Sequence, residues 1–312
     1  MACVSDGQAL EAETACGIAV ALRSAIWDEH RGSGPVVLAD DIGRFVLNAI
    51  QLDDGRKMSF LHQVCEKENA PTIVFVHGFP LDHKMWLGQM PLSDEATLLI
   101  PDLPGFGQSD PAGDGLSMKG MADDVAQLLE TLGVSKVIWC GLSMGGYVGW
   151  EFIRNHREML AGLICCNTRA TADDEATVRA RRFAASQVVK TGARPVADAM
   201  RGKLFANSTI AERPDVVESI VDTICKTAPE TIAAAQIAMS RRTDFSTELG
   251  TIDVPTLVVA GDCDSITPSS EMQLMSMEIS AATFVELSET GHMSPLERSQ
   301  GFNRAVTHWL SR

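Results

Sequence analysis

Short apolar runs that lack polar alternation recur along the chain from about residue 45 onward. The run Thr72–Val76 is an example, in which β-branched and aromatic residues follow one another and end at His77-Gly78. Runs of this kind are typical of strands that are buried on both faces of a sheet. Strands are therefore expected at residues 45–51, 58–64, 72–76, 97–100, 136–140, 163–166, 255–260 and 283–287.

Segments with helical periodicity lie between several of these strands, at residues 117–132, 144–160 and 296–310. The first two strands instead flank Asp53-Asp54-Gly55, a turn typical of a hairpin. Strands that alternate with helices form parallel sheets covered on both faces. The pattern therefore predicts an α/β fold with a mostly parallel central sheet flanked by helices.

Residues 167–251 interrupt this alternation. The interval is rich in Ala, Met and Arg, and its helical windows fall at 174–190, 195–205, 215–226 and 229–241. We interpret it as a helical cap that is inserted late in the sheet and lies over the strand ends. The predicted core is then 45–166 together with 252–312, and residues 1–44 form a loosely ordered N-terminal extension.

Composition narrows the possible partners. Asp and Glu outnumber Lys and Arg by 41 to 26, and a net charge of −15 argues against nucleic acid as a partner. The eight cysteines include no CxxC pair and no zinc-like spacing, so we expect mostly buried, reduced thiols and no metal. No apolar stretch reaches the roughly 18–20 residues of a membrane span, and the N-terminal residues lack the Lys/Arg-then-apolar order that is typical of a signal peptide. The chain is thus expected to be cytoplasmic, with no membrane partner.

The sharpest local motif surrounds Ser143, in Gly141-Leu142-Ser143-Met144-Gly145-Gly146. It lies where the strand 136–140 meets the helix that begins near Met144, which is the setting that a G-x-S-x-G nucleophile turn requires. Such a turn is too tight for a Cβ atom two residues before or after the serine. The motif predicts Ser143 as the nucleophile of a serine enzyme.

A serine hydroxyl needs a base, and the base needs a carboxylate to orient it. His292 is the candidate base, because it follows a late strand in a Gly-flanked loop. The loop after the strand 255–260 offers two aspartates, and we favour Asp264, which lies further out, over Asp262. Two other histidines, His77 and His83, lie in the loop after the first core strand, which could line the same site.

An oxyanion formed by attack on a carbonyl needs backbone amides. The residue after the nucleophile, Met144, supplies one amide. The second is expected from the loop after the strand 72–76, where Phe79 is the natural donor and Pro80, which has no amide hydrogen, fixes the loop.

Taken together, the motifs resemble those of the α/β-hydrolase fold superfamily over about residues 45–312. They are HGFP (77–80), PDLPGFGQSD (101–110), GLSMGG (141–146), GDCDSITP (261–268) and GHMSPLE (291–297). The resemblance implies the chain order Ser, Asp, His for the catalytic residues, with Asp264 as the acid and residues 167–251 as the cap. The serine at position 143 does not match haloalkane dehalogenases or epoxide hydrolases, which use an aspartate nucleophile. The chain looks nearer to serine carboxylesterases, enol-lactonases and cofactor-free haloperoxidases.

The expected function is hydrolysis of a small carboxylic ester, lactone or related acyl substrate through an acyl-enzyme intermediate, without a cofactor. The expected partner is a small ester-like molecule. Two alternatives stay open. One is a C–C bond hydrolase or lyase with the same triad, and the other is a non-catalytic ligand-binding protein on a hydrolase fold.

Overall fold

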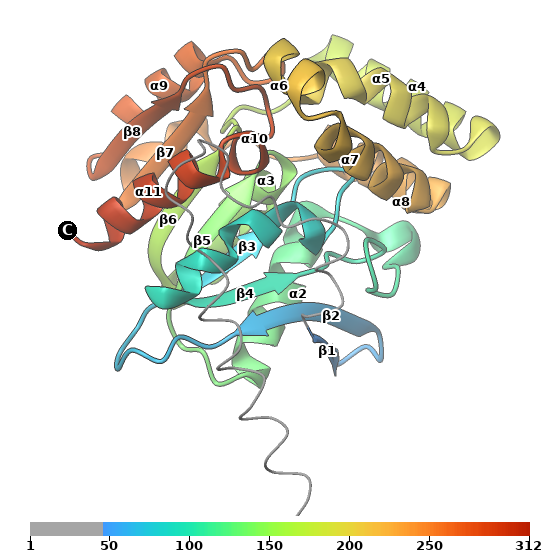
Figure 1. Ribbon diagram of the computed structural model, residues 1–312. Helices are drawn as coiled ribbons and strands as arrows, with labels where there is room; N and C mark the ends of the chain where they lie inside the picture. The colour runs from blue at the N-terminus through green and yellow to red at the C-terminus, as the bar shows by residue number, and fades with distance from the viewer. Residues whose placement is uncertain (1–45) are drawn as a thin grey trace, which may run out of the picture. The chain divides into compact units, whose positions relative to one another are not determined.

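Eight strands form one sheet in the computed structural model, which describes residues 46–312 (Figure 1). The strands are β1 (Leu47–Gln51), β2 (Lys57–Gln63), β3 (Thr72–Val76), β4 (Thr97–Pro101), β5 (Val137–Leu142), β6 (Leu160–Cys166), β7 (Thr256–Gly261) and β8 (Ala282–Leu287). Their order is β1-β2-β4-β3-β5-β6-β7-β8. Only the pairs β1–β2 and β2–β4 are antiparallel, so the prediction of a mostly parallel sheet is confirmed. The predicted N-terminal extension lies outside the described residues.

Helices cover both faces of this sheet, because alternate residues of each central strand point to opposite sides. On β3, Val74 and Val76 join the core cluster that contains α2 and α3 residues. The residue between them, Phe75, instead packs against Trp86 of η2, which in turn contacts Phe302 of α11. The α2–α3 pair and the η2–α11 pair are therefore the two outer layers.

The helices of the core fall between and after the strands. They are η2 (His83–Asp94), η3 (Gly113–Gly115), α2 (Met118–Thr131), α3 (Met144–Asn155), η4 (Arg157–Met159), α9 (Ser269–Met277), α10 (Ser294–Glu297) and α11 (Ser299–Leu310). Ser117 begins α2 with an N-cap bond from Gly120 N to its Oγ of 3.0 Å. No helix of residues 46–312 is long and apolar enough to cross a membrane.

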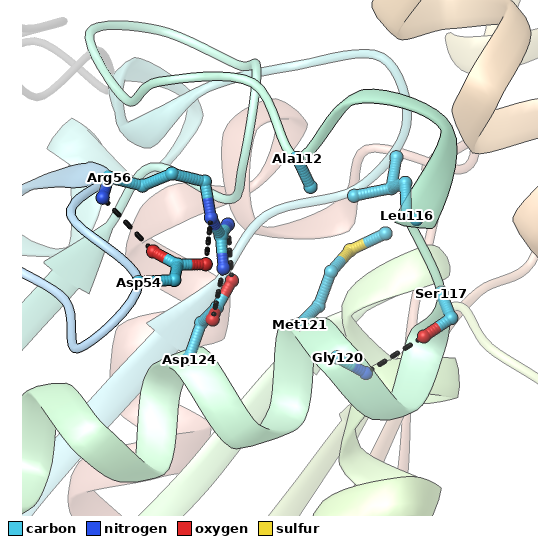
Figure 2. A pocket seen from close by; sticks show the side chains of 9 residues that line it. Asp54, Arg56, Ala112, Leu116, Ser117, Gly120, Met121 and Asp124 are labelled. Carbon is cyan, nitrogen blue, oxygen red and sulfur yellow. Dashed lines mark hydrogen bonds and ion pairs between the residues drawn. The ribbon is translucent and has the colours of Figure 1, made fainter.

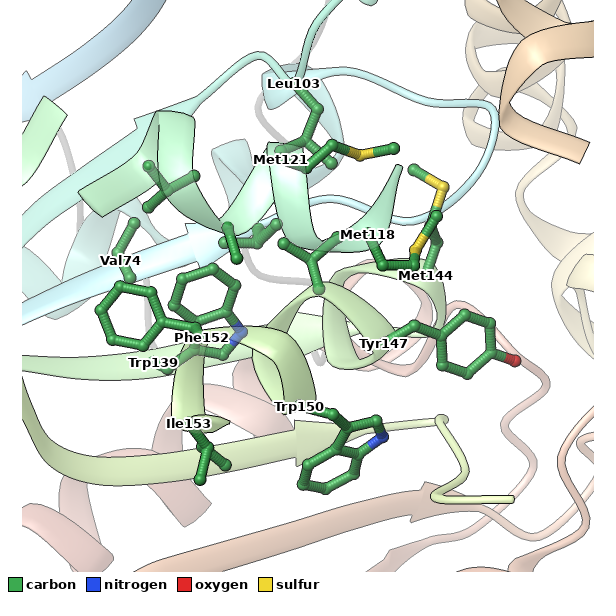
Figure 3. Packing of buried hydrophobic residues seen from close by; sticks show 14 of the residues in the cluster. Val74, Leu103, Met118, Met121, Trp139, Met144, Tyr147, Trp150, Phe152 and Ile153 are labelled. Atoms are coloured by element: carbon green, nitrogen blue, oxygen red, sulfur yellow. The ribbon is translucent and has the colours of Figure 1, made fainter. Parts of the chain in front are cut away.

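The core between the sheet, α2 and α3 is built from large side chains (Figure 3). Trp139 of β5 lies against Phe152 of α3 with ring centroids 4.7 Å apart, and its Nε1 donates to the carbonyl of Gly145 at 3.0 Å. Burying side chains of this size stabilises a fold by roughly 1.5–3 kcal/mol each. The packing therefore fixes the start of α3 against β5, which is where the serine motif lies.

Five α-helices and the short helix η5 (Ser246–Thr251) lie between β6 and β7. The α-helices are α4 (Glu175–Thr191), α5 (Arg194–Leu204), α6 (Asn207–Glu212), α7 (Pro214–Lys226) and α8 (Pro229–Ser240), and Figure 1 shows them gathered at one end of the sheet. They contact loops at the carboxyl ends of the strands: Thr227 Oγ1 donates to Pro80 O at 3.3 Å, and a Cβ at Gly105 would collide with Thr231. We refer to residues 167–251 as the cap.

Several elements differ from the predicted ones. Helix α3 ends at Asn155 rather than near residue 160, because Arg154–Glu158 offers no apolar side chain to bury. The predicted final helix is divided into two helices, α10 and α11, because the backbone of Arg298 between them (φ −128°, ψ 53°) is not helical. Helices η2 and α9 were not predicted.

Candidate active site

Ser143 lies on a sharp turn between β5 and α3. Its φ of 51° and ψ of −110° are unfavourable for a residue with a side chain, at a cost on the order of 1–3 kcal/mol. The predicted need for small neighbours is met, because a Cβ at Gly145 would overlap the carbonyl oxygen of Val76 and one at Gly141 would overlap that of Gly145. The turn thus holds the serine in a strained conformation at the carboxyl edge of the sheet.

Hydrogen bonds to the neighbouring strand maintain this turn. The Ser143 amide donates to Cys166 O at 3.0 Å, and the Ser143 carbonyl accepts from Thr168 Oγ1 at 2.8 Å. The residue between these two partners, Asn167, donates from Nδ2 to Asp264 at 2.8 Å and to Gly291 O at 3.3 Å. The end of β6 therefore connects the serine turn to the loops that carry Asp264 and His292.

Asp264 and His292 form a buried pair. His292 Nδ1 lies 2.8 Å from Asp264 Oδ2, and the side chains are 3% and 0% exposed. Asp264 also accepts from Ile266 N at 2.8 Å and Thr267 N at 3.0 Å at Oδ1, and from Thr267 Oγ1 at 2.6 Å at Oδ2. Because a carboxylate only accepts, the Nδ1 atom of His292 carries the proton that faces it. The other ring nitrogen, Nε2, is then the basic atom of a neutral imidazole.

Burial opposes ionisation of Asp264, but the charge and hydrogen bond of His292 together with the bonds from Thr267 and Asn167 outweigh it. The pKa of Asp264 falls from 3.8 to about 2. The carboxylate therefore stays ionised throughout the range in which a histidine changes its protonation state.

This lowered pKa predicts a specific acid sensitivity. A carboxyl group whose pKa is lower in the folded state stabilises the fold above its unfolded pKa of 3.8, and the contribution disappears as the pH falls through about 2. The full contribution is about 2 kcal/mol, of which about 1 kcal/mol is lost between pH 5 and pH 3. Urea unfolding of the wild type and Asp264→Asn at both pH values should show the difference in unfolding free energy shrink by that amount. A difference that is constant with pH would contradict the depressed pKa.

The second aspartate of this loop, Asp262, has another partner. Its Oδ1 accepts a hydrogen bond from Thr290 N at 3.0 Å, which ties the loop after β7 to the one after β8. The structure therefore places Asp264, the favoured candidate, against His292, and gives Asp262 the bracing contact.

The loop after β3 lies beside the serine turn. A Cβ built at Gly78 would lie 2.9 Å from Leu142 Cδ2 and 3.6 Å from the Cβ of Ser143. The next amide, that of Phe79, donates to no acceptor among residues 46–312. Met144 is the first residue of α3. Its amide therefore has no acceptor within the helix, because no helical residue lies one turn before it. Both predicted oxyanion donors are thus free to bind an anion.

The histidines near β3 shape this loop. His77 is fully buried, and its Nε2 accepts from Leu103 N at 3.0 Å, so its Nδ1 donates to Gly78 O at 3.0 Å. Burial lowers the pKa of His77, which keeps it neutral. His83 pairs with the buried Asp102 through Nδ1 at 2.8 Å. Neither forms a hydrogen bond or ion pair with His292 or Asp264, and the partners of both lie in the loops after β3 and β4.

The arginines at the start of the cap have acidic partners. Arg169 lies 3.2 Å from Glu271, and Arg181 lies 2.6 Å from the buried Asp173. Arg179 pairs with Glu175 on the surface at 3.3 Å. Each of these three guanidinium groups therefore has an acidic partner within the chain.

Two residues of the site were not assigned roles from the sequence: Asn167 and Thr267, which both donate to Asp264. The signal for Asn167 was present, because it directly follows β6, the neighbour of the strand that precedes Asp264. Polar residues at the carboxyl ends of adjacent parallel strands meet at one edge of the sheet.

A cavity of about 220 Å³ lies elsewhere, between the β1–β2 turn, the loop before α2 and α2 itself (Figure 2). Arg56 is its central side chain and pairs with Asp54 at 2.6 Å and Asp124 at 2.8 Å. None of its lining residues is a predicted site residue. Within residues 46–312, no group of three His, Cys, Asp or Glu side chains is arranged to hold a metal ion.

Comparison with known proteins agrees with this fold. The family model described as alpha/beta hydrolase fold matches residues 71–205. A thermophilic esterase from Thermogutta terrifontis is 36% identical with a TM-score of 0.81, over 85% of this chain and 98% of that one. The enol-lactonase from Burkholderia xenovorans is 27% identical with a TM-score of 0.77, over 85% and 100%.

Among curated proteins, 3-oxoadipate enol-lactonase 2 of Acinetobacter baylyi is 27% identical over 245 residues, which are 78% of this chain and 90% of that protein. These matches and the fold show that the chain belongs to the α/β-hydrolase fold family of enzymes. Esterases and enol-lactonases are among its relatives within that family.

Proposed function

We propose that the chain is a serine hydrolase that cleaves a small carboxylic ester or lactone through an acyl-enzyme intermediate. The observation that carries this proposal is the buried Asp264–His292 pair, joined through Asn167 to the strained turn at Ser143. Relatives named as esterases and enol-lactonases support the choice of ester and lactone substrates.

The first half of the reaction acylates the serine. Ser143 Oγ attacks the acyl carbonyl carbon while His292 Nε2 takes the hydroxyl proton. Asp264 holds the resulting imidazolium through Nδ1 and stabilises its charge. The amides of Phe79 and Met144 donate to the oxyanion of the tetrahedral intermediate. The intermediate collapses as His292 returns the proton to the leaving alcohol oxygen, which in a lactone stays attached to the acyl group.

The second half reverses these roles with water. His292 Nε2 takes a proton from a water molecule, whose oxygen attacks the acyl carbonyl, and the same amides hold the second oxyanion. The proton then passes to Ser143 Oγ as the carboxylic acid leaves. The cap closes the site over these groups, so that its side chains would set the size of the acyl or alcohol group.

The cysteine thiols bear on the cellular compartment in which we propose the enzyme acts. The cysteines of the described residues are free, and those at 65, 140, 165 and 166 are buried, whereas Cys225 is half-buried and Cys263 is exposed. Free thiols favour a reducing compartment, so we place the activity in the cytoplasm, with a small acyl substrate as the partner.

Covalent labelling tests the mechanism directly. A fluorophosphonate should attach one phosphonyl group to Ser143, because the reagent needs an activated serine and an oxyanion site. Intact mass followed by peptide mapping measures the position. Heat-denatured protein, in which the serine is no longer activated, should stay unlabelled. Labelling at another residue, or none while p-nitrophenyl esters and γ-lactones are still hydrolysed, would refute the serine mechanism.

A further inference from the structure

A buried carboxylate lies at the junction of the cap and the loop that carries His292. Glu297, in α10, is 1% exposed. Its Oε2 accepts from Ala206 N at 2.8 Å and from Thr209 Oγ1 at 2.7 Å, and its Oε1 accepts from Met293 N at 3.1 Å. No basic side chain of residues 46–312 forms an ion pair with it. All partners of the carboxylate are therefore uncharged donors.

The same cap segment, residues 204–209, also bonds the backbone of the histidine loop. Leu204 O accepts from His292 N at 2.9 Å and from Met293 N at 3.2 Å. The two backbones lie close together, since a Cβ at Gly291 would come within 2.6 Å of Ala206 N. The amide of His292 itself is thus held by the cap.

The donors at this junction require a side chain that offers two acceptor oxygens, which a carboxylate provides. Burying a charge without a cation is costly, and burial raises the pKa of Glu297 despite the hydrogen bonds that it accepts. Apolar side chains would join the segments at lower cost, but they would leave the amide of Ala206 and the hydroxyl of Thr209 without their acceptor. A glutamine would turn an NH₂ group toward donors.

We propose that Glu297 is a positioning residue, which fastens cap residues 204–209 to the loop 291–293 and so holds the His292 imidazole in line with Ser143. This inference rests on the proposed function. Asp264 fixes one side of the ring, and the Glu297 junction fixes the backbone from which the ring extends. The cap is then part of the catalytic geometry as well as a cover over the substrate.

Removing the carboxylate should slow chemistry more than it weakens binding. A displacement of a catalytic group by about 1 Å costs about 100-fold in rate. We expect Glu297→Gln to lower kcat about 10- to 100-fold for p-nitrophenyl acetate, with KM within about threefold, and to slow fluorophosphonate labelling of Ser143 in proportion. The apparent pKa in the kcat profile should also shift, because the surroundings of His292 change.

Two further variants make the test decisive. Thr209→Val removes one donor and keeps the carboxyl group of Glu297, so kcat should fall several-fold with little change in KM. Glu289→Gln is the matched control: it lies in the same loop, but its side chain is 76% exposed and pairs with Arg298 on the surface. The control should retain wild-type kcat and KM.

Each outcome has a definite meaning. A folded Glu297→Gln with wild-type kcat, or one with only a lower Tm, overturns the proposal. If that variant does not fold, unchanged kcat in Thr209→Val overturns it and a reduced kcat supports it. If the wild type itself hydrolyses no ester or lactone, the proposed function has failed. Hydrogen exchange then tests the junction: faster exchange of the Ala206 and Met293 amides in Glu297→Gln supports it, and unchanged exchange overturns it.

Discussion

Replacement of Ser143 by alanine is expected to lower kcat for p-nitrophenyl esters by roughly 10⁴- to 10⁶-fold, because the acyl-enzyme can no longer form. The fold should persist, since alanine occupies less space and the backbone bonds from the Ser143 amide to Cys166 and from Thr168 to the Ser143 carbonyl are retained. Steady-state kinetics with acyl chains of increasing length, alongside a thermal unfolding curve, measures both quantities.

The matched control for this change is Ser186→Ala. That serine lies on the cap helix α4 and is exposed, and its Oγ bonds only neighbours on its own helix: it donates to the Phe183 carbonyl at 2.7 Å and accepts from Gln187 Nε2 at 3.3 Å. It should keep wild-type kinetics. Residual turnover of more than about 1% in Ser143→Ala, far above the range typical of nucleophile deletions, would mean that another group is the nucleophile.

Replacement of Asp264 by asparagine is expected to lower kcat by about 10⁴-fold through the tautomer of the histidine. The amide oxygen is needed at the Oδ1 position, where Ile266 N and Thr267 N donate. The NH₂ group then faces His292 Nδ1, which must accept, so the proton moves to Nε2 and the base loses its lone pair. KM should change little, because the side chain of Asp264 is fully buried against His292 and is not exposed to a ligand.

The pH profile provides the check. In Asp264→Asn, activity should recover partly at alkaline pH, where hydroxide can take the serine proton in place of His292. Asp262→Asn, which alters the loop contact with Thr290 and not the contact with His292, should lose far less activity. Equal losses in the two variants would mean that Asp264 acts as a loop brace and does not orient His292.

Much of the site was predictable from local sequence because its physics is local. A turn that excludes Cβ atoms at positions 141 and 145 requires glycine at both, and this pair of glycines around one serine can be recognised in the sequence. The strands were recognisable for a similar reason, since burial on both faces demands continuous apolar runs such as Thr72–Val76.

The residues that support the site were harder to find, because their contacts are distant in sequence. Glu297 bonds Ala206 across 91 positions, and Asn167 bonds Asp264 across 97. No periodic pattern encodes such pairs. Helix η2 escaped prediction because it contains Pro91 and buries residues of both polar and apolar type, including His83 and Gln89.

The attachment of residues 204–209 to the histidine loop has a consequence for protein engineering. A chimaera in which the cap is exchanged for that of another family member keeps its two covalent connections near residues 167 and 251, but these do not reproduce the bonds to His292 N and Glu297. Exchange boundaries that leave residues 204–209 with the recipient would separate the alignment of the base from the remaining cap helices, which we propose determine substrate choice. The cap is therefore two transferable units with different tolerances, rather than one module.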